Sequence, residues 1–236
     1  MSNVKAVGFV SRHKFAKITT MKSLNLARPQ MLLVVGNPGA GKSFFARQFS
    51  ETFDAPAISV DRIRYELFAK QTFSADENDL VNRMASYFTD ELLKTKRSFL
   101  LDGGCNARTD RARLTQEAKK AGYDVSVIWI QTDLATCRAR ALKRNPKRSE
   151  DDKFTTAMDD QTFEALVRRF TEPNRENYVV ISGKHTYNTQ AKMVLRKMVA
   201  AREAVAEAAH RQETEQVRQS SRPETGPGTR RSVVIR

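Results

Sequence analysis

The sequence predicts an α/β fold in which a mainly parallel, five-stranded sheet lies between layers of helices. Short apolar runs bounded by turn residues recur along the chain, and helix-like segments separate them. This alternation is typical of a parallel sheet whose two faces are both covered. The expected strands are Met31–Val35, Ala57–Val60, Ser98–Leu101, Val125–Ile130 and Tyr178–Ile181. Ligands of such folds bind beyond the carboxyl ends of the strands, so functional residues are expected just after them.

The first expected strand leads directly into a glycine-rich loop with the complete pattern G-x-x-x-x-G-K-[ST]. Its residues are Gly36, Asn37, Pro38, Gly39, Ala40, Gly41, Lys42 and Ser43. The glycines allow successive backbone N–H groups to point into one cavity, and the following helix adds its positive dipole end. Lys42 is expected to reach the β- and γ-phosphates, and the Ser43 hydroxyl to ligate Mg²⁺. The loop therefore predicts binding of a nucleoside triphosphate with Mg²⁺.

The second expected strand is followed by Asp61 and Arg64 at the start of a helix. A spacing of three places both side chains on one helical face. On the nucleotide side of the sheet, Asp61 can act as the general base that accepts a hydroxyl proton, while Arg64 orients the acceptor. The structural alternative is an N-capping aspartate beside an ordinary surface arginine.

The third expected strand ends next to Asp102, where a carboxylate would face the magnesium ion. Asp102 is expected to hold a metal-bound water or the acceptor. No glutamate follows it, so the Asp-Glu pair with which ATPase motors activate water is missing, and hydrolysis is not the expected task. The glycines at 103 and 104 indicate either a plain turn or a close approach of substrate.

The fourth expected strand is followed by a basic segment, 137–148, that ends in a proline-containing turn. Arg140, Arg144 and Arg148 lie four residues apart, and on a helix the first two share a face. Such a segment can close as a lid, with Arg140 on the nucleotide and the other two neutralising the transferring phosphoryl group. A solvated basic helix is the alternative.

The ends of the chain differ in composition from its centre. The net charge is +14, but residues 1–30 contain six Lys and Arg and no acidic residue, and residues 191–236 contain ten against five. The excess therefore lies in the extensions, which weakens the case for a nucleic-acid-binding core. The expected division is a basic extension at 1–30, a catalytic domain at 31–190, a helix at 191–219 and a disordered tail at 220–236. A transit peptide is an alternative for the first segment.

Cysteine content and hydropathy indicate a cytoplasmic location. Cys105 and Cys137 have neither C-x-x-C spacing nor a nearby histidine, which argues against a disulfide framework or a thiolate metal site. No run approaches the roughly 18 apolar residues of a membrane helix, so no membrane partner is expected. The long C-terminal helix is a candidate surface for a protein partner.

Taken together, four features resemble the P-loop kinase family that includes phage polynucleotide kinase and zeta toxins, the AAA_33-like ATP-binding kinases. They are the loop 36–43, the Asp61-x-x-Arg64 pair, Asp102 at a strand end, and Arg144-x-x-x-Arg148. The resemblance spans about residues 31–182 and implies a three-layer α/β/α P-loop NTPase fold with a helical lid. The run 143–148 looks like the lid of the polynucleotide kinase branch, whereas the D-x-x-R pair also occurs in zeta-type kinases.

One segment departs from the family pattern. Where the family usually has Asp-Thr-Asn or Asp-Ala-Thr-Asn, this chain has the run Asp102-Gly103-Gly104-Cys105-Asn106, which leaves the acceptor contact open. The chain also has no D-x-D-x-T sequence, so a fused phosphatase is not expected.

The function expected from these residues is ATP-dependent transfer of the γ-phosphate to a hydroxyl acceptor, with Mg²⁺. Lys42, Asp61, Arg64, Arg144 and Arg148 are the expected catalytic residues, and Ser43 and Asp102 the metal ligands. The acceptor is a nucleic-acid 5′-hydroxyl, a nucleoside or another small molecule, or an amino-sugar nucleotide as for a zeta toxin. A nucleotide-gated binding protein is the alternative from another class.

Overall fold

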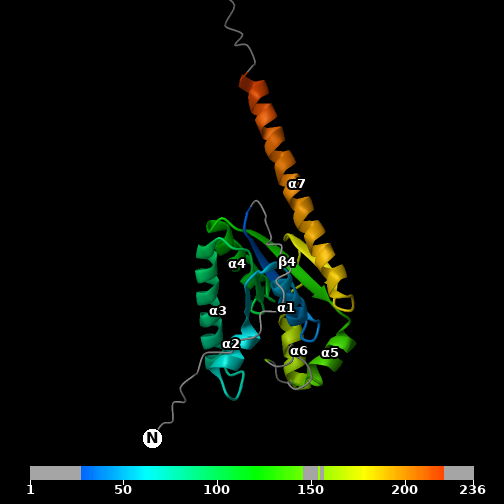
Figure 1. The fold of residues 1–236 in the computed structure, drawn as a ribbon. Coiled ribbons are helices and arrows are strands. Elements are labelled where there is room, and N and C mark those ends of the chain that lie inside the picture. The colour runs from blue at the N-terminus through cyan, green and yellow to red at the C-terminus, as the bar shows by residue number, and fades with distance from the viewer. Residues whose placement is uncertain (1–27, 146–153, 155–156, 221–236) are drawn as a thin grey trace, which may run out of the picture.

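The computed structural model describes residues 28–145, 154 and 157–220. Its strands are β1 (Gln30–Val35), β2 (Ala57–Ser59), β3 (Phe99–Asp102), β4 (Asp124–Gln131) and β5 (Tyr178–Ser182). Its helices are α1 (Lys42–Phe53), α2 (Val60–Leu67), α3 (Ala75–Thr95), α4 (Arg108–Lys120), α5 (Leu134–Leu142), α6 (Asp160–Arg169) and α7 (Tyr187–Ser220). Strands and helices alternate along most of this order, and Figure 1 shows the sheet between two groups of helices.

The five strands form one sheet in the order β2-β3-β1-β4-β5, and every neighbouring pair is parallel. The predicted α/β fold with a parallel sheet is therefore confirmed. The central strand is β1, which pairs with β3 on one side and with β4 on the other. Since all strands run in the same direction, their carboxyl ends lie along one edge of the sheet.

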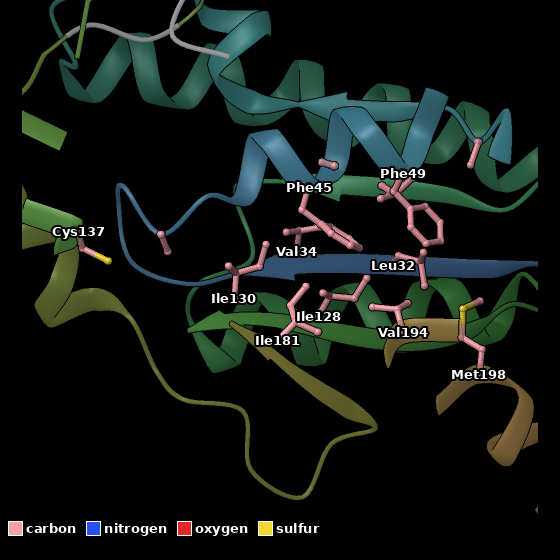
Figure 2. Close-up of a cluster of buried hydrophobic side chains, with 14 of the residues drawn as sticks. Leu32, Val34, Phe45, Phe49, Ile128, Ile130, Cys137, Ile181, Val194 and Met198 are labelled. Atoms are coloured by element: carbon pink, nitrogen blue, oxygen red, sulfur yellow. The ribbon is translucent and has the colours of Figure 1, made fainter. Parts of the chain in front are cut away.

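Side chains of β1 alternate between the two faces of the sheet and join two separate hydrophobic cores. Leu32 and Val34 belong to the core beneath α1, α5, α6 and α7, in which Phe45 and Phe49 of α1 point toward the strand (Figure 2). Met31, Leu33 and Val35 belong to the core beneath α3 and α4. All five residues of β1 from Met31 are 0% exposed. Burial of both faces explains why this strand reads as a continuous apolar run instead of an alternating one.

The C-terminal helix α7 begins at Tyr187, four residues before the segment that the sequence predicted for it, and it continues to Ser220. Its first turns pack on the sheet core through Val194 and Met198, and Tyr187 donates a hydrogen bond to the hydroxyl of Thr52 in α1. The rest of the helix extends away from the sheet (Figure 1). No helix among the described residues is both long and apolar enough to cross a bilayer.

Helices α2 and α3 are joined by a buried ion pair between Arg64 and Glu77. The two side chains are 8% and 3% exposed, and their closest nitrogen and oxygen are 2.5 Å apart. Glu77 also accepts hydrogen bonds from the backbone N–H groups of Thr72 and Phe73. Despite the opposing effect of burial, hydrogen bonds from Arg64 and Thr72 hold the pKa of Glu77 at about 2.

We expect Glu77→Gln to destabilise the fold by about 3 kcal/mol at neutral pH, because the buried Arg64 guanidinium would lose its counter-charge. The folded-state pKa of Glu77 lies below its usual value of 4.5, so the carboxylate stabilises the fold above that pH. This contribution is lost as the pH falls from about 4.5 to about 2. Thermal unfolding measured across this range should therefore be less steeply pH-dependent in the variant than in the parent protein.

A suitable control is Glu91→Gln, which removes an exposed carboxylate that pairs with Lys94 on the same helix. Its melting temperature should follow that of the parent at each pH, because exposed pairs contribute little. Equal acid sensitivity in the parent and in the Glu77 variant would show that this pair does not govern acid unfolding.

Candidate active site

The glycine-rich loop lies against neighbouring backbone with no room for side chains at two of its glycines. An ideal Cβ on Gly36 would lie 2.5 Å from the carbonyl oxygen of Ile130, and one on Gly39 would lie 2.2 Å from that of Cys137. Both glycines have positive φ angles, 144° and 79°. Backbone conformation and close approach therefore both require glycine at these positions.

Helix α1 begins at Lys42 with its first backbone N–H groups available for an anion. Gly41 is the N-cap residue, with φ of 106°, and no described side chain caps the helix. Anions bind at such a terminus because the first N–H groups have no partner within the helix and the helix dipole is positive there. Among the other residues of the loop, Pro38 and Ala40 are buried, and Asn37 has its Oδ1 atom buried without a hydrogen-bond partner among the described residues.

Lys42 is partly buried, and its ammonium group donates to the carbonyl oxygens of Gly36 and Asn37, each at 3.0 Å. Burial lowers the pKa of Lys42, while the nearby carboxylates of Asp102 and Asp61 oppose this effect. An ammonium has three N–H donors, so one of them is left for a phosphate oxygen.

Asp102 is the last residue of β3, is 5% exposed, and accepts a side-chain hydrogen bond from Ser43. Burial raises its pKa to about 6, although Lys42 lowers it. A hydroxyl and a carboxylate side by side provide the oxygen ligands that Mg²⁺ prefers. The two residues predicted to ligate the metal therefore lie together and have the right chemistry for it.

Asp61 lies in the first turn of α2, whose N-cap is Ser59, so the alternative role of Asp61 as the N-capping residue is wrong. Its carboxylate interacts electrostatically with both Lys42 and Asp102. Asp61 is only partly buried, so part of its surface is accessible to solvent. Its role as general base stays a prediction.

Arg64 lies on α2 together with Asp61, but the Arg64 guanidinium binds side chains of α3. Its two terminal nitrogens donate to Glu77 and to the side chain of Asn78, and its Nε atom is buried without a partner among the described residues. The guanidinium also lies over the ring of Phe73 at 4.7 Å. The expected contact of Arg64 with an acceptor stays a prediction, and the visible task of this residue is to fix α2 on α3.

The basic segment after β4 differs from the predicted helix. Helix α5 ends at Leu142, so the prediction that Arg140 and Arg144 share a helical face is wrong. The proline at position 146 disfavours helical geometry in the residue before it, residue 145, so the helix was not expected to continue to residue 148, but it ends before Arg144 as well. Arg144 nevertheless interacts electrostatically with Lys42 and Asp102, and Arg140 donates a hydrogen bond to the carbonyl of Gly39 at 3.5 Å. Arg148 lies outside the described residues.

Three residues that hold the loop in place were missed by the sequence analysis as functional residues. The side-chain amide of Asn106 makes two hydrogen bonds to the backbone of Gly36, and the Thr132 hydroxyl donates to the carbonyl of Ala40. Arg111 in α4 donates to the backbone carbonyl of Asn106. The only sequence signal for Asn106 was its place in the run after Asp102.

Two further features lie outside this site. The Cys105 thiol is fully buried, donates to the carbonyl of Val34, and has its pKa raised by burial to about 12, so it faces the core and not a substrate. A crevice of about 500 Å³ lies between α1 and α7, lined among others by Thr52, Tyr187 and Leu195, and it includes no residue of the glycine-rich loop.

Residues 31–173 match the family model AAA_33, described as an AAA domain. Among curated proteins, the chain is 28% identical over 154 residues to a "Protein KTI12 homolog" of Arabidopsis thaliana, covering 62% of this chain and 49% of that protein. It is 30% identical over 125 residues to an adenylate kinase of Fervidobacterium nodosum, covering 48% of this chain and 57% of that protein. The chain thus spans about half the length of these relatives.

Solved structures share the fold at low sequence identity. The APS kinase CysC of Mycobacterium tuberculosis, in complex with AMPPNP and APS, aligns with a TM-score of 0.54 and 19% identity, covering 72% of this chain and 98% of that one. Kti12 of Chaetomium thermophilum, in complex with ADP-AlF3, aligns with a TM-score of 0.52 and 21% identity, covering 69% and 94%.

We expect Gly39→Ala to weaken ATP binding by at least about tenfold, because the new methyl group would push the loop away from the Cys137 carbonyl. A suitable control is Gly122→Ala, since Gly122 has almost the same φ, 78°, with no atom within 4 Å of the added Cβ. Both variants should lose about 1–2 kcal/mol of stability from the left-handed backbone. Only the Gly39 variant should lose affinity in a titration with ATP, and equal affinities would contradict the steric argument.

Proposed function

The chain belongs to the AAA_33 family, a P-loop kinase family, and from this premise we propose that it is an ATP-dependent kinase that transfers the γ-phosphate to a hydroxyl acceptor. One observation carries the proposal. Lys42, Asp61, Asp102 and Arg144, which come from four separate segments, interact electrostatically at the carboxyl edge of the sheet. An ammonium, two carboxylates and a guanidinium around one anion-binding loop are the groups that phosphoryl transfer uses.

In the proposed reaction the acceptor oxygen attacks the γ-phosphorus and the bond from that phosphorus to the bridging oxygen of ADP breaks. Asp61 accepts the proton of the acceptor hydroxyl. Lys42 and Arg144 stabilise the negative charge on the phosphoryl oxygens. Ser43 and Asp102 would hold Mg²⁺, which neutralises phosphate charge when bound. Positioning and electrostatic stabilisation supply most of the rate enhancement in such reactions.

We propose residues 31–190 as the catalytic unit, in which Arg140 contacts the nucleotide and Arg64 and Arg148 serve the acceptor and the transferred phosphate. For the acceptor we propose, in order, a nucleic-acid 5′-hydroxyl, a nucleoside or small molecule, and a sugar nucleotide. The basic ends at 1–30 and 191–236 favour the first, because they can add salt-sensitive affinity for phosphate backbones. A cytoplasmic location stays a prediction.

The acceptor class can be identified with γ-labelled ATP and a panel of RNA, DNA, nucleosides and sugar nucleotides. The rate of label transfer to a nucleic-acid acceptor should fall steeply as the salt concentration rises, whereas transfer to a small acceptor should show little salt dependence.

The long helix α7, which extends beyond the sheet, favours a second candidate, a nucleotide-gated binding protein. Bound ATP that is retained without transfer to any acceptor would support that candidate.

We expect Asp61→Asn to lower the rate of phosphate transfer by about 10²-fold or more, because the amide cannot accept the hydroxyl proton. ATP affinity should change by less than about threefold, since the proposed task of Asp61 belongs to the transition state. Asp79→Asn is the matched control, because Asp79 is an exposed carboxylate paired with Arg83 in α3. Transfer at the parent rate by the Asp61 variant would exclude this residue as the base.

A further inference from the structure

The side-chain amide of Asn106 binds both the backbone N–H and the backbone carbonyl of Gly36, the first glycine of the loop. Its Oδ1 atom accepts from the N–H of Gly36 and its Nδ2 atom donates to the Gly36 carbonyl, both at 3.2 Å. The contact lies just beyond the paired ends of β1 and β3, where Val34 is in register with Asp102. Because glycine has no side chain to anchor it and adopts many conformations, Gly36 depends on such outside contacts for its orientation.

The Gly36 carbonyl is shared between Asn106 and Lys42. The ammonium of Lys42 donates to this oxygen and to that of Asn37, each at 3.0 Å. These two bonds direct the third N–H of the ammonium, and the orientation of the Gly36 carbonyl therefore helps to determine where that N–H points. Asn106 acts on Lys42 through Gly36, without touching the lysine itself.

Asn106 is in turn held by an ion pair between a buried arginine of α4 and a partly buried glutamate in the segment before β5. Arg111 is 1% exposed and donates to the backbone carbonyls of Cys105 and Asn106, at 3.3 and 2.8 Å. Its remaining nitrogens donate to both carboxylate oxygens of Glu176, at 2.8 and 3.0 Å. The N–H of Thr171 also donates to the Asn106 carbonyl. Two-point pairing of this kind fixes the plane of the guanidinium and so the position of the carbonyls that it binds.

We propose that Asn106 is a positioning residue for ATP binding, which aims the ammonium of Lys42 at the phosphates through the Gly36 carbonyl, and that Arg111 and Glu176 hold Asn106 in place. The inference rests on the proposed function only in requiring that ATP occupies the loop. Asn106 therefore supports nucleotide binding and does not contact the acceptor, a contact that the sequence analysis left open for the run 102–106.

The test is a double-mutant cycle between Asn106→Ala and Lys42→Ala, with the dissociation constant of ATP measured in the absence of any acceptor. In the parent background, Asn106→Ala should weaken ATP binding by about tenfold, since two hydrogen bonds that orient the loop are lost. In the Lys42→Ala background the same change should cost less than about twofold, because the group on which Asn106 acts has been removed. An equal loss in both backgrounds would overturn the proposal.

The role of the ion pair is tested by Glu176→Gln, which keeps the shape of the side chain and removes its charge. This change should weaken ATP binding by about threefold in the parent and leave it unaltered in the Asn106→Ala background. Melting temperatures of all variants separate this effect from unfolding. A lower melting temperature with unchanged ATP affinity would show that the pair is structural only, and would overturn its part of the proposal.

Arg113→Ala is the matched control, because Arg113 lies on the same helix as Arg111 and pairs with Glu117 at the surface. It should leave ATP affinity unchanged. If Asn106→Ala raised the KM for an acceptor while ATP affinity stayed the same, Asn106 would belong to the acceptor site and the proposal would fail. Failure of the parent protein to bind ATP would instead refute the proposed function.

Discussion

The structure depends on the close approach of backbone to backbone around the glycine-rich loop. Gly36 lies against the end of β4 and Gly39 against α5, at distances that exclude even a methyl group. Gly183, just after β5, is equally close to the carbonyl of Ala40. The end of β4, the adjoining helix α5 and the residue after β5 thus form the walls of one loop that lies about 90 residues or more before them in the sequence. Since a side chain at any of the three glycines would collide with this neighbouring backbone, the observed conformation of the loop requires glycine at positions 36, 39 and 183.

The charged groups of the site are organised around Lys42. Burial disfavours its positive charge, and the carboxylates of Asp61 and Asp102 offset this penalty. Conversely, Lys42 lowers the pKa of Asp102, which burial raises. The carboxylates that stabilise the lysine are also the proposed base and metal ligand. One cation therefore allows two acidic groups to lie close together, and the burial of Asp102 strengthens its attraction to Lys42 relative to that of an exposed pair.

The sheet, its strand positions and the location of the loop could be predicted from the sequence, because buried parallel strands read as apolar runs and the loop has a distinctive spacing. The lid helix was predicted too long, because Lys143 and Arg144 are good helix formers and give no local signal for the end that the structure places at Leu142. The partners of Arg64 and Arg111 could not be foreseen. Glu77 and Glu176 lie 13 and 65 residues away along the chain, and no local pattern links an arginine to a particular distant carboxylate.

The strand order has a consequence for how the protein is made. The central strand β1 is the first of the five strands to be translated, yet its neighbours β3 and β4 follow only after the chain has continued past residues 99 and 124. Gly183, which lies close to the Ala40 carbonyl of the loop, is translated later still. Non-local parallel pairings of this kind form slowly. During synthesis, the glycine-rich loop therefore cannot complete its contacts, and the apolar strand before it cannot be covered on both sides, until the chain has been translated past Gly183.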